Sequence, residues 1–529
     1  MKITSLTVAS AIALFSSTAI ANTPVPPLER LTGLSIGELQ DGLVLGGLSS
    51  EEIVRLYIDR MHAIDDTGHT INAVIALYPD ALETARTLDA ERAAGHVRGT
   101  LHGIPIVIKD NIEADGALAT TAGSLALADN VTGRDSPLVA RLRNAGAIIL
   151  GRTNLSEWAN FRSNSSTSGW SAMWGLTRNP HSLDRSACGS SSGSGAAVAA
   201  SLAAAAIGTE TDGSIVCPAG TNGIVGFKPT LGLVSRRYIV PISHSQDTAG
   251  PMTHNVRDAA LILSVIAGTD PQDEATAEAD ARRSDYAASL SPSGLRGQRI
   301  GVMRDRVGNN PAVLALLDQA VAVLRTQGAT IVDIADSGID DDTLGEAEFA
   351  VLLTEFKADL NAYLAGIPFR TPRTPITLAQ LIAFNRAEPR EMQWFGQETF
   401  ERAEATTGTS DEAYQTALAT AQRLAGADGI DRLRLDYHVD LLLGVTNGPA
   451  WAIDLVNGDN YGGPGSATLP AVAGYPHLTV PMGAIHGLPI GLSFIGTRWD
   501  DARVLNAGYA YEQASHAMVS PAYQAAIAP

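Results

Sequence analysis

Lysine is scarce in this chain, and one lysine stands where its amine could act as a base. Lysine occurs only at positions 2, 109, 228 and 357, and Lys109 ends the apolar run IVIK. Burial removes the hydration that stabilises an ammonium group, so the pKa of a buried lysine falls and its neutral amine can accept a proton. A lysine at a strand end more often extends to water, so Lys109 needs partners before it indicates catalysis.

Two segments rich in serine and glycine could supply a nucleophile and an anion-binding loop. The first reads CGSSSGSGAA from Cys188 to Ala197, and the second reads GTETDGSIVCPA from Gly208 to Ala219. Glycines at 208 and 213 permit a tight loop in which the N–H groups of residues 211 to 214 converge on an oxyanion. Taken alone, Ser214 is either an ordinary turn serine or a nucleophile.

Two other kinds of catalytic site are disfavoured. Residues Gly189 to Gly193 fit the G-x-S-x-G nucleophile elbow centred on Ser191, but that motif follows a strand, and the preceding RNPHSLDRSAC is polar and contains proline. The eleven histidines are scattered, and no pair has the spacing of zinc ligands such as H-E-x-x-H. We therefore predict neither a metal site nor a cofactor.

The elements that must position these residues alternate between strands and helices. Short apolar runs predict strands, and apolar residues at helical spacing after the capping sequence Ser49-Ser50-Glu51-Glu52 predict a helix. The Ala-rich run from Ala196 to Ile207 is predicted as a helix packed on every side. The expected strands are 101–109, 145–150, 299–303, 331–334, 441–445, 477–482 and 490–495, with further helices at 311–327 and 502–514.

This alternation predicts an α/β fold built on a large sheet that helices cover on both faces. From 345 to 435 the pattern becomes mostly helical and polar, which indicates a helical insertion at the rim of the sheet. We expect this insertion and the loop from Ser163 to Trp174 to form walls of the substrate pocket.

Composition and the N-terminus restrict the compartment and the partners. The chain has 529 residues and a net charge of −19, and it lacks clusters of Lys and Arg, which argues against nucleic-acid binding. Lys2, the apolar stretch that follows and Ala19-Ile20-Ala21 form the pattern of a secretory signal peptide over residues 1–21. We predict an exported protein, periplasmic or secreted, that begins at Asn22 and has no membrane segment after cleavage. Its two cysteines could pair or remain free thiols.

Together, the segments IVIKDN, CGSSSGS and GTETDGSIVCPA resemble the amidase signature family, and the resemblance extends from about Leu48 to the C-terminus. Further matching segments are GRTNLSEWAN, GIVGFKPTLGLVSR, DTAGPM and AGYPHLTVPMG. Matching without gaps places the family's lysine on Lys109, its bridging serine on Ser190 and its nucleophile on Ser214. The fold implied is a single large mixed β-sheet covered by helices, so that residues 22–529 form the catalytic domain.

The resemblance implies amide hydrolysis through an acyl-enzyme on Ser214. Ser190, which the family holds through a cis peptide bond, would relay the proton of Ser214 to neutral Lys109. Ser191 would support this network by hydrogen bonding. The oxyanion hole would be formed by the N–H groups of Thr211, Asp212, Gly213 and Ser214.

A few residues depart from the common family pattern. Glu210 stands in place of Asp, Asp212 and Ser192 in place of Gly, and Val216-Cys217 in place of Arg-x. A carboxylate on Asp212 beside a developing oxyanion is unfavourable unless its side chain points away. These variants, with EFKADLNAYL from Glu355 to Leu364, resemble the peptide amidases, which remove the C-terminal amide of peptides.

The sequence therefore predicts hydrolysis of a peptide carboxamide to the acid and ammonia, without an obligate protein partner. The alternatives left open are a broader amidase acting on small aliphatic, aryl or fatty amides, and an inactive binding protein on the same scaffold. A component of a tRNA amidotransferase shares the signature, but the predicted export and the acidic composition argue against it. Contact between Ser190 and Ser214 would bring Cys188 and Cys217 close enough to bridge.

Overall fold

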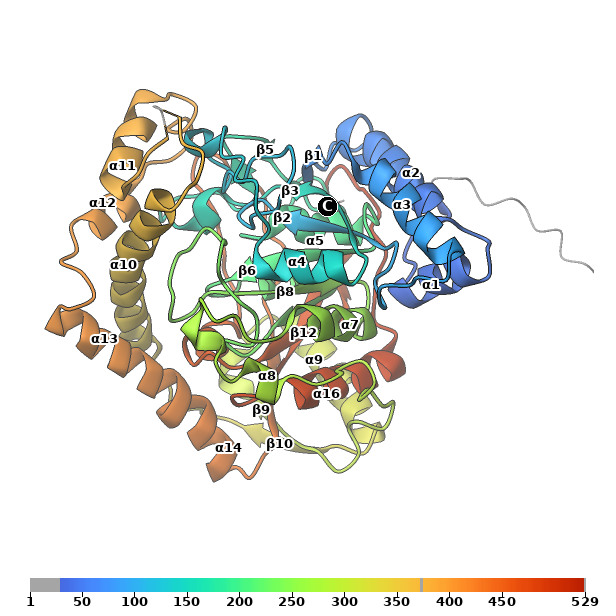
Figure 1. The fold of residues 1–529 in the computed structure, drawn as a ribbon. Coiled ribbons are helices and arrows are strands. Elements are labelled where there is room, and N and C mark those ends of the chain that lie inside the picture. The colour runs from blue at the N-terminus through green and yellow to red at the C-terminus, as the bar shows by residue number, and fades with distance from the viewer. Residues whose placement is uncertain (1–28, 372–373, 528–529) are drawn as a thin grey trace, which may run out of the picture.

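The computed structural model describes residues 29–371 and 374–527, so the predicted signal peptide at residues 1–21 lies outside the described residues. The centre of the molecule is one 11-stranded sheet in the order β1-β3-β2-β6-β8-β7-β12-β13-β11-β9-β10 (Figure 1). Its strands are β1 Val74–Leu77, β2 Pro105–Lys109, β3 Ile148–Thr153, β6 Ala205–Glu210, β7 Val225–Lys228, β8 Thr248–Thr253, β9 Arg299–Met303, β10 Thr330–Ile334, β11 Leu441–Val445, β12 His477–Ile485 and β13 Leu488–Ile495. β4 Trp170–Ser171 and β5 Gly175–Leu176 form a separate small hairpin.

The sheet is mixed, with a group of parallel strands on each side of an antiparallel middle and with the edge strand β1 antiparallel to β3. β3, β2 and β6 run parallel, as do β11, β9 and β10, whereas β8, β7, β12 and β13 are antiparallel to their neighbours. In the parallel pair β2–β6, Ile108 lies opposite Ile207. The carboxyl ends of β2 and β6 therefore reach the same edge of the sheet, which is where open α/β sheets usually bind ligands.

Helices cover both faces of this sheet, as predicted. α4 Pro137–Asn144, α7 Val256–Ile266, α16 Asp501–Ser515 and α9 Pro311–Thr326 contact one another in that order, and α4, α7 and α16 lie in front of the sheet in Figure 1. α5 Ser192–Ala199 and α6 Val216–Thr221 contact each other and pack against strands from β2 to β13. α1 Ile36–Val44, α2 Ser50–Arg60 and α3 Ala81–Ala93 lie beside the β1 edge, where the Ser49 side chain caps α2 by accepting a hydrogen bond from the Glu52 amide.

The predicted single helix from Ala196 to Ile207 is wrong. α5 ends at Ala199, the chain turns at Ser201 with a φ of 53°, and β6 begins at Ala205. Every residue from 192 to 210 in these two elements is buried. An apolar run that is buried on all sides has no periodicity, so the pattern alone cannot separate a helix from a strand that lies between two others. As a consequence Gly208 belongs to a strand rather than to the predicted loop.

The segment predicted as a helical insertion, 345–435, connects β10 to β11 and forms an arc along one side of the sheet (Figure 1). It contains α10 Asp341–Ala365, α11 Leu378–Ala387, α12 Glu398–Glu404, α13 Glu412–Gln422, a π-helix Arg423–Asp431 and α14 Arg432–Asp436. Two apolar clusters anchor the arc. One packs α10, α11 and α12 against Trp158, Phe161 and Ile242, and the other packs the 421–433 region against β9, β11 and α15 Thr468–Val472.

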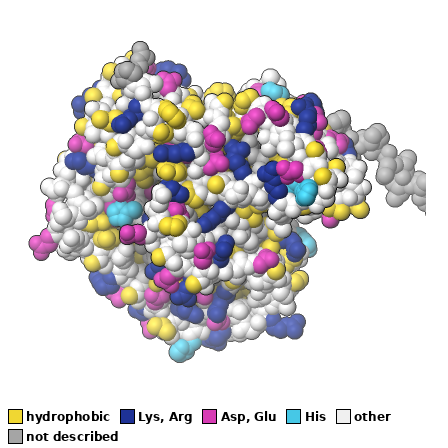
Figure 2. Space-filling model, in the orientation of Figure 1, with side chains coloured by type: hydrophobic (Ala, Val, Ile, Leu, Met, Phe, Trp, Pro, Cys, Tyr) yellow, Lys and Arg dark blue, Asp and Glu magenta, His cyan; other side chains and the backbone are white. Residues whose placement is uncertain are grey.

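The surface carries no single field of charge on the face drawn in Figure 2, where basic and acidic side chains are interspersed. Among the described residues, no helix is both long enough and apolar enough to cross a bilayer.

Candidate active site

Lys109 ends β2 in the middle of the protein, with its side chain fully buried. Its Nζ lies 2.7 Å from Ser190 Oγ, 2.8 Å from Thr209 Oγ1 and 3.2 Å from the Thr209 carbonyl oxygen. The parallel β2–β6 pairing brings Thr209 to Lys109, because both residues stand at the carboxyl ends of adjacent strands. Asn111, two residues further on, donates from Nδ2 to Thr209 Oγ1 at 3.0 Å.

Burial lowers the pKa of Lys109 from 10.5 to about 7, and the negative charges of Asp247 and Glu210 offset part of that shift. A neutral amine at this position has a lone pair that can accept the proton of the Ser190 hydroxyl, 2.7 Å away. The site thus contains an amine that is about half deprotonated at pH 7 and largely deprotonated at mildly alkaline pH.

The Ser190 segment is held rigidly on all sides. The peptide bond between Gly189 and Ser190 is cis, as the resemblance implies. Ser190 is fully buried, and its carbonyl accepts a hydrogen bond from the Ser156 amide at 3.0 Å. A Cβ on Gly189 would come within 2.1 Å of Ser156 Oγ, so only glycine fits there. Ser191 Oγ donates to the Thr209 carbonyl at 3.1 Å and accepts from the Thr209 amide at 3.2 Å, which fixes this segment to β6.

Ser214 lies in the turn between β6 and α6. Gly213 makes the turn possible with a φ of +79°, a conformation that side-chain-bearing residues rarely adopt. Glu210, the last residue of β6, accepts hydrogen bonds from the amides of Ile215 at 2.8 Å and Val216 at 3.0 Å and so fixes the far side of the turn. Burial raises the pKa of Glu210, and these amide hydrogen bonds lower it. Ser214 itself is buried, with the residue 8% exposed.

The fold brings the Ser190 and Ser214 segments together. The Ser191 amide donates to the Ser214 carbonyl at 3.1 Å, and Cys188 and Cys217 form a disulfide with their Cα atoms 6.0 Å apart. The pairing of the cysteines, which the sequence left open, is thus settled by the structure. Within the described residues no hydrogen bond joins the Ser190 and Ser214 side chains, whereas Ser190 and Lys109 are in direct contact.

The predicted oxyanion-hole residues line the same turn. In the described part of the chain, the amides of Asp212 and Ser214 donate to no other group. The Gly213 amide forms a hydrogen bond to the Glu210 carboxylate, which lowers the pKa of Glu210. The Asp212 side chain accepts a hydrogen bond from Thr468 Oγ1 of α15 at 2.8 Å. Burial raises the pKa of Asp212 above its ordinary value.

A pocket of about 380 Å³ opens onto this site. At one end it reaches Asn111, Ser190, Thr209 and Thr211, and its wall is apolar from Ile239 to Ile242. The expectation for the insertion is met in one place, since Asp359 and Ala362 of α10 line the pocket. The loop from Ser163 to Trp174 does not line it and packs instead around the β4–β5 hairpin and Phe395. That loop prediction was wrong, since the chain from 236 to 248 supplies much of the pocket lining.

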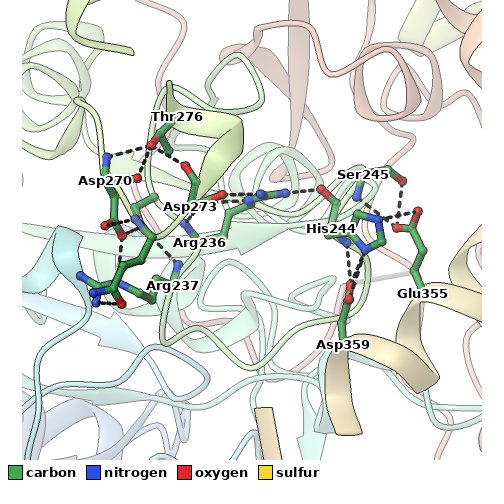
Figure 3. Close-up of polar contacts among 11 residues, drawn as sticks. Arg236, Arg237, His244, Ser245, Asp270, Asp273, Thr276, Glu355 and Asp359 are labelled. Carbon is green, nitrogen blue, oxygen red and sulfur yellow. Dashed lines mark hydrogen bonds and ion pairs between the residues drawn. The ribbon is translucent and has the colours of Figure 1, made fainter. Parts of the chain in front are cut away.

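The mouth of the pocket is charged, and Figure 3 shows how the charges pair. Arg236 donates to Asp273 and to the His244 carbonyl, and the ring of His244 lies between Asp359 at 2.9 Å and Glu355 at 3.4 Å. The hydrogen bond to Asp359 raises the pKa of His244. The ligand-type atoms of His244, Glu355 and Asp359 lie within 4.8 Å of one another, a grouping that spacing along the sequence does not reveal.

The comparison with known proteins decides the family. A sequence model of the family described as Amidase matches residues 52–505. This chain belongs to the Amidase family. The amidase is 39% identical over 479 residues to a probable amidase of Arabidopsis thaliana, with 88% of this chain and 87% of the relative covered. It is 35% identical to a glutamyl-tRNA(Gln) amidotransferase component of Moorella thermoacetica, with 91% of this chain and 96% of the relative covered.

Among solved structures, the amidase is similar to the native peptide amidase from Stenotrophomonas maltophilia, with a TM-score of 0.88 and 48% identity. That match covers 94% of this chain and 100% of the other. The predicted family, the mixed sheet flanked by helices and the amide-hydrolase class are therefore confirmed.

Several residues of the amidase site are missing from the sequence-based prediction. Thr209, Asn111 and Asp247 all face the Lys109 region, yet a threonine, an asparagine and a loop aspartate carry no chemical signature of their own. The signals that could have found them are positional. Asn111 follows Lys109 in IVIKDN, Thr209 follows Gly208 in GTETDGS, and Asp247 begins DTAGPM.

Proposed function

We propose that this amidase hydrolyses the C-terminal carboxamide of peptides to the free acid and ammonia, with Ser214 as nucleophile, Ser190 as proton relay and Lys109 as base. The observation that carries the proposal is the buried Lys109 amine, whose pKa is lowered to about 7 and which lies 2.7 Å from the Oγ of Ser190, a residue that lines the pocket. The resemblance to a peptide amidase in sequence and fold supports the substrate class.

In the proposed first step, Ser214 Oγ attacks the amide carbon while its proton passes to Ser190, and the Ser190 proton passes to Lys109. The amide carbonyl oxygen becomes an oxyanion, which accepts hydrogen bonds from the N–H groups of the 211–214 turn. When the C–N bond breaks, the proton returns along the same path to the leaving nitrogen and ammonia departs. Water then attacks the acyl-enzyme, and the same groups transfer its proton to release the peptide acid.

The proposal requires that Ser214 reach Ser190 when substrate is bound. The disulfide and the Ser191–Ser214 backbone hydrogen bond keep the two segments adjacent, so rotation of the Ser214 side chain is the movement that closes the relay. All three residues are buried, with exposed fractions of 0% for Lys109 and Ser190 and 8% for Ser214. Burial keeps the proposed base and the proposed relay from water.

The test measures ammonia release from four substrates: a dipeptide amide, benzamide, a fatty acid amide and free glutamine. We expect kcat/KM to be highest for the dipeptide amide and to vanish in the Ser214→Ala variant. A preference for benzamide or the fatty amide would favour a broader amidase, and a preference for glutamine would favour the activity of an amidotransferase component.

We also propose that residues 1–21 are a signal peptide and that the mature enzyme is exported. The supporting observation is the Lys2, apolar stretch and Ala-Ile-Ala pattern at the N-terminus. Expression of the full chain in a Gram-negative host, followed by fractionation and intact mass, tests this proposal. The expected product is periplasmic and begins at Asn22; an uncleaved cytoplasmic chain contradicts it.

A further inference from the structure

One carboxylate links the predicted oxyanion loop to the wall of the pocket. Asp247 Oδ1 accepts a hydrogen bond from Thr211 Oγ1 at 2.6 Å. Its other oxygen accepts from the amides of Ile242 at 2.8 Å and Ser243 at 2.9 Å. Asp247 therefore closes its own loop and at the same time holds the first residue after β6, from which the 211–214 turn departs.

Helix α10 of the insertion also holds the loop that carries Asp247, through hydrogen bonds to its acidic side chains. Its acidic residues Glu348, Glu355 and Asp359 are spaced by seven and four positions, which places them on one face of the helix. Each of these carboxylates accepts a hydrogen bond from the loop. Gln246 Nε2 donates to Glu348 at 2.8 Å. The Ser245 amide donates to Glu355 at 3.0 Å and the His244 amide donates to Asp359 at 2.9 Å, as Figure 3 shows.

The chain of contacts is therefore continuous from the insertion to the turn. Gln246 Nε2 also donates to the Thr211 carbonyl at 3.3 Å, so Thr211 is held both through its side chain by Asp247 and through its backbone by Gln246. These two contacts restrict the orientation of Thr211.

Asp247 is also close enough to Lys109 for its charge to act on the amine. The negative groups that act on Lys109 are Asp247 and Glu210. Asp247 itself lines the pocket together with Ser190 and Thr209, and the charged groups that face it from other elements are Arg236 and Asp359. Asp247 lines the pocket and Glu210 does not, so Asp247 is the carboxylate that acts on Lys109 from the pocket side.

We infer that Asp247 is a positioning residue for amide hydrolysis, which orients Thr211 at the start of the oxyanion turn and supplies the negative charge that faces the Lys109 amine from the pocket. The inference rests on the proposed function, since it assumes that Lys109 is the base. Asp247 thus has two effects that mutation can separate, one on the orientation of Thr211 and one on the charge near Lys109.

The sign of the charge effect follows from electrostatics. A carboxylate beside an amine favours the ammonium form, so Asp247 raises the pKa of Lys109 against the effect of burial. Burial raises the pKa of Asp247 itself to about 6, so this carboxyl is mostly ionised at pH 7, where Lys109 titrates. Removing the carboxylate therefore lowers the pKa of Lys109 and moves the acid limb of the pH–rate profile to lower pH.

The experiment compares pH profiles of kcat/KM on a dipeptide amide for the wild type, Asp247→Asn, Thr211→Val and Glu355→Gln. In Asp247→Asn we expect a lower plateau and an acid limb moved down by about half a unit, which raises the activity at pH 7 from about one half to about three quarters of its own plateau. Thr211→Val loses the hydrogen bond to Asp247 but keeps the Asp247 charge, so the plateau of kcat/KM should fall while the acid limb keeps its wild-type position. Glu355→Gln weakens the hydrogen bonds between α10 and the loop but does not change the charge near Lys109, so the acid limb of its pH profile should also keep the wild-type position.

An Asp247→Asn limb that coincides with the wild-type limb overturns the inference, as does a limb that moves equally in Thr211→Val. Thermal melts establish that each variant is folded, and Asp247→Ser removes the same charge with a smaller side chain if the asparagine variant does not fold. If neither folds, Asp247 is a structural residue and the inference is wrong. Activity that survives in Lys109→Met would instead contradict the proposed function, which keeps the two failures distinct.

Discussion

The pKa of Lys109 makes the sharpest prediction, because it fixes the position and the direction of the acid limb. With a pKa of about 7 the amine is neutral in about half of the molecules at pH 7, against roughly one in 3,000 at the ordinary value of 10.5. Since the base must be unprotonated to accept a proton, kcat/KM should rise with pH and level off above pH 8. Below pH 7 it should fall by about tenfold per unit.

The assay follows ammonia release from a dipeptide amide between pH 5 and pH 9 at constant ionic strength, under conditions where the rate reports kcat/KM. Lys109→Met removes the amine and should abolish turnover. Lys109→Arg keeps a cation of similar length that does not lose its proton in this range, so it should be as inactive as the methionine variant. A limb centred near pH 10, or an arginine variant with wild-type activity, refutes the assignment of the base.

Stability gives a second readout that does not depend on activity. The pKa of Lys109 in the folded chain is lower than in the unfolded chain, so between pH 7 and about 10 the unfolded chain binds more protons. Over that window the unfolding free energy of the wild type should rise relative to that of Lys109→Met by up to about 1.4 kcal/mol per pH unit. A constant difference between the two chains across this window would show that the lysine does not titrate there.

Three further predictions concern the nucleophile, the disulfide and the mouth of the pocket. Ser214→Ala should lose turnover and covalent labelling by a serine-reactive probe while its melting temperature stays within a few degrees of the wild type; labelling that persists would place the nucleophile elsewhere. The unreduced, unfolded chain should titrate with no free thiol, and replacing Cys188 and Cys217 by serine should lower the unfolding free energy by about 3 to 4 kcal/mol, because the bond closes a loop of 29 residues. Prolonged chelation should leave kcat/KM unchanged, since the proposed steps use only serine hydroxyls and an amine; a loss restored by a divalent metal would assign a role to the group around His244.

The elements that the sequence predicts well are those with clear ends. Leu441–Val445 and Arg299–Met303 are strands with the predicted bounds, because each is a short apolar run between polar residues. Ala196–Ile207 fails for the opposite reason. Its alanines are small enough to be buried as a helix or as a strand in the middle of a sheet, and only the turn at Ser201 separates the two elements.

The site shows the same limit at the level of side chains. Lys109, Ser190 and Ser214 could be proposed as catalytic residues because a lysine, a serine-rich run and a glycine turn each suggest chemistry, and a family pattern connects them. The pairing of β2 with β6 brings Thr209 within hydrogen-bond distance of the Lys109 amine. The packing of the helical insertion brings Asp359 and Ala362 to the pocket. Such contacts join residues far apart in the chain, and no local pattern encodes them.

Asp212 shows how the fold resolves a conflict that the sequence raises. A carboxylate in the turn proposed to bind the oxyanion would oppose the negative charge of the intermediate if it were ionised and faced the substrate. Its side chain instead accepts a hydrogen bond from Thr468 of α15. Glu348 of α10 is close enough that burial and the charge of Asp212 together raise its pKa, just as burial raises that of Asp212. Since each negative charge disfavours the other, the pair retains a proton more readily than two isolated acids would. The turn proposed to bind the oxyanion therefore faces less negative charge than a count of its acidic residues suggests, and the Asp212 side chain fixes the turn to α15.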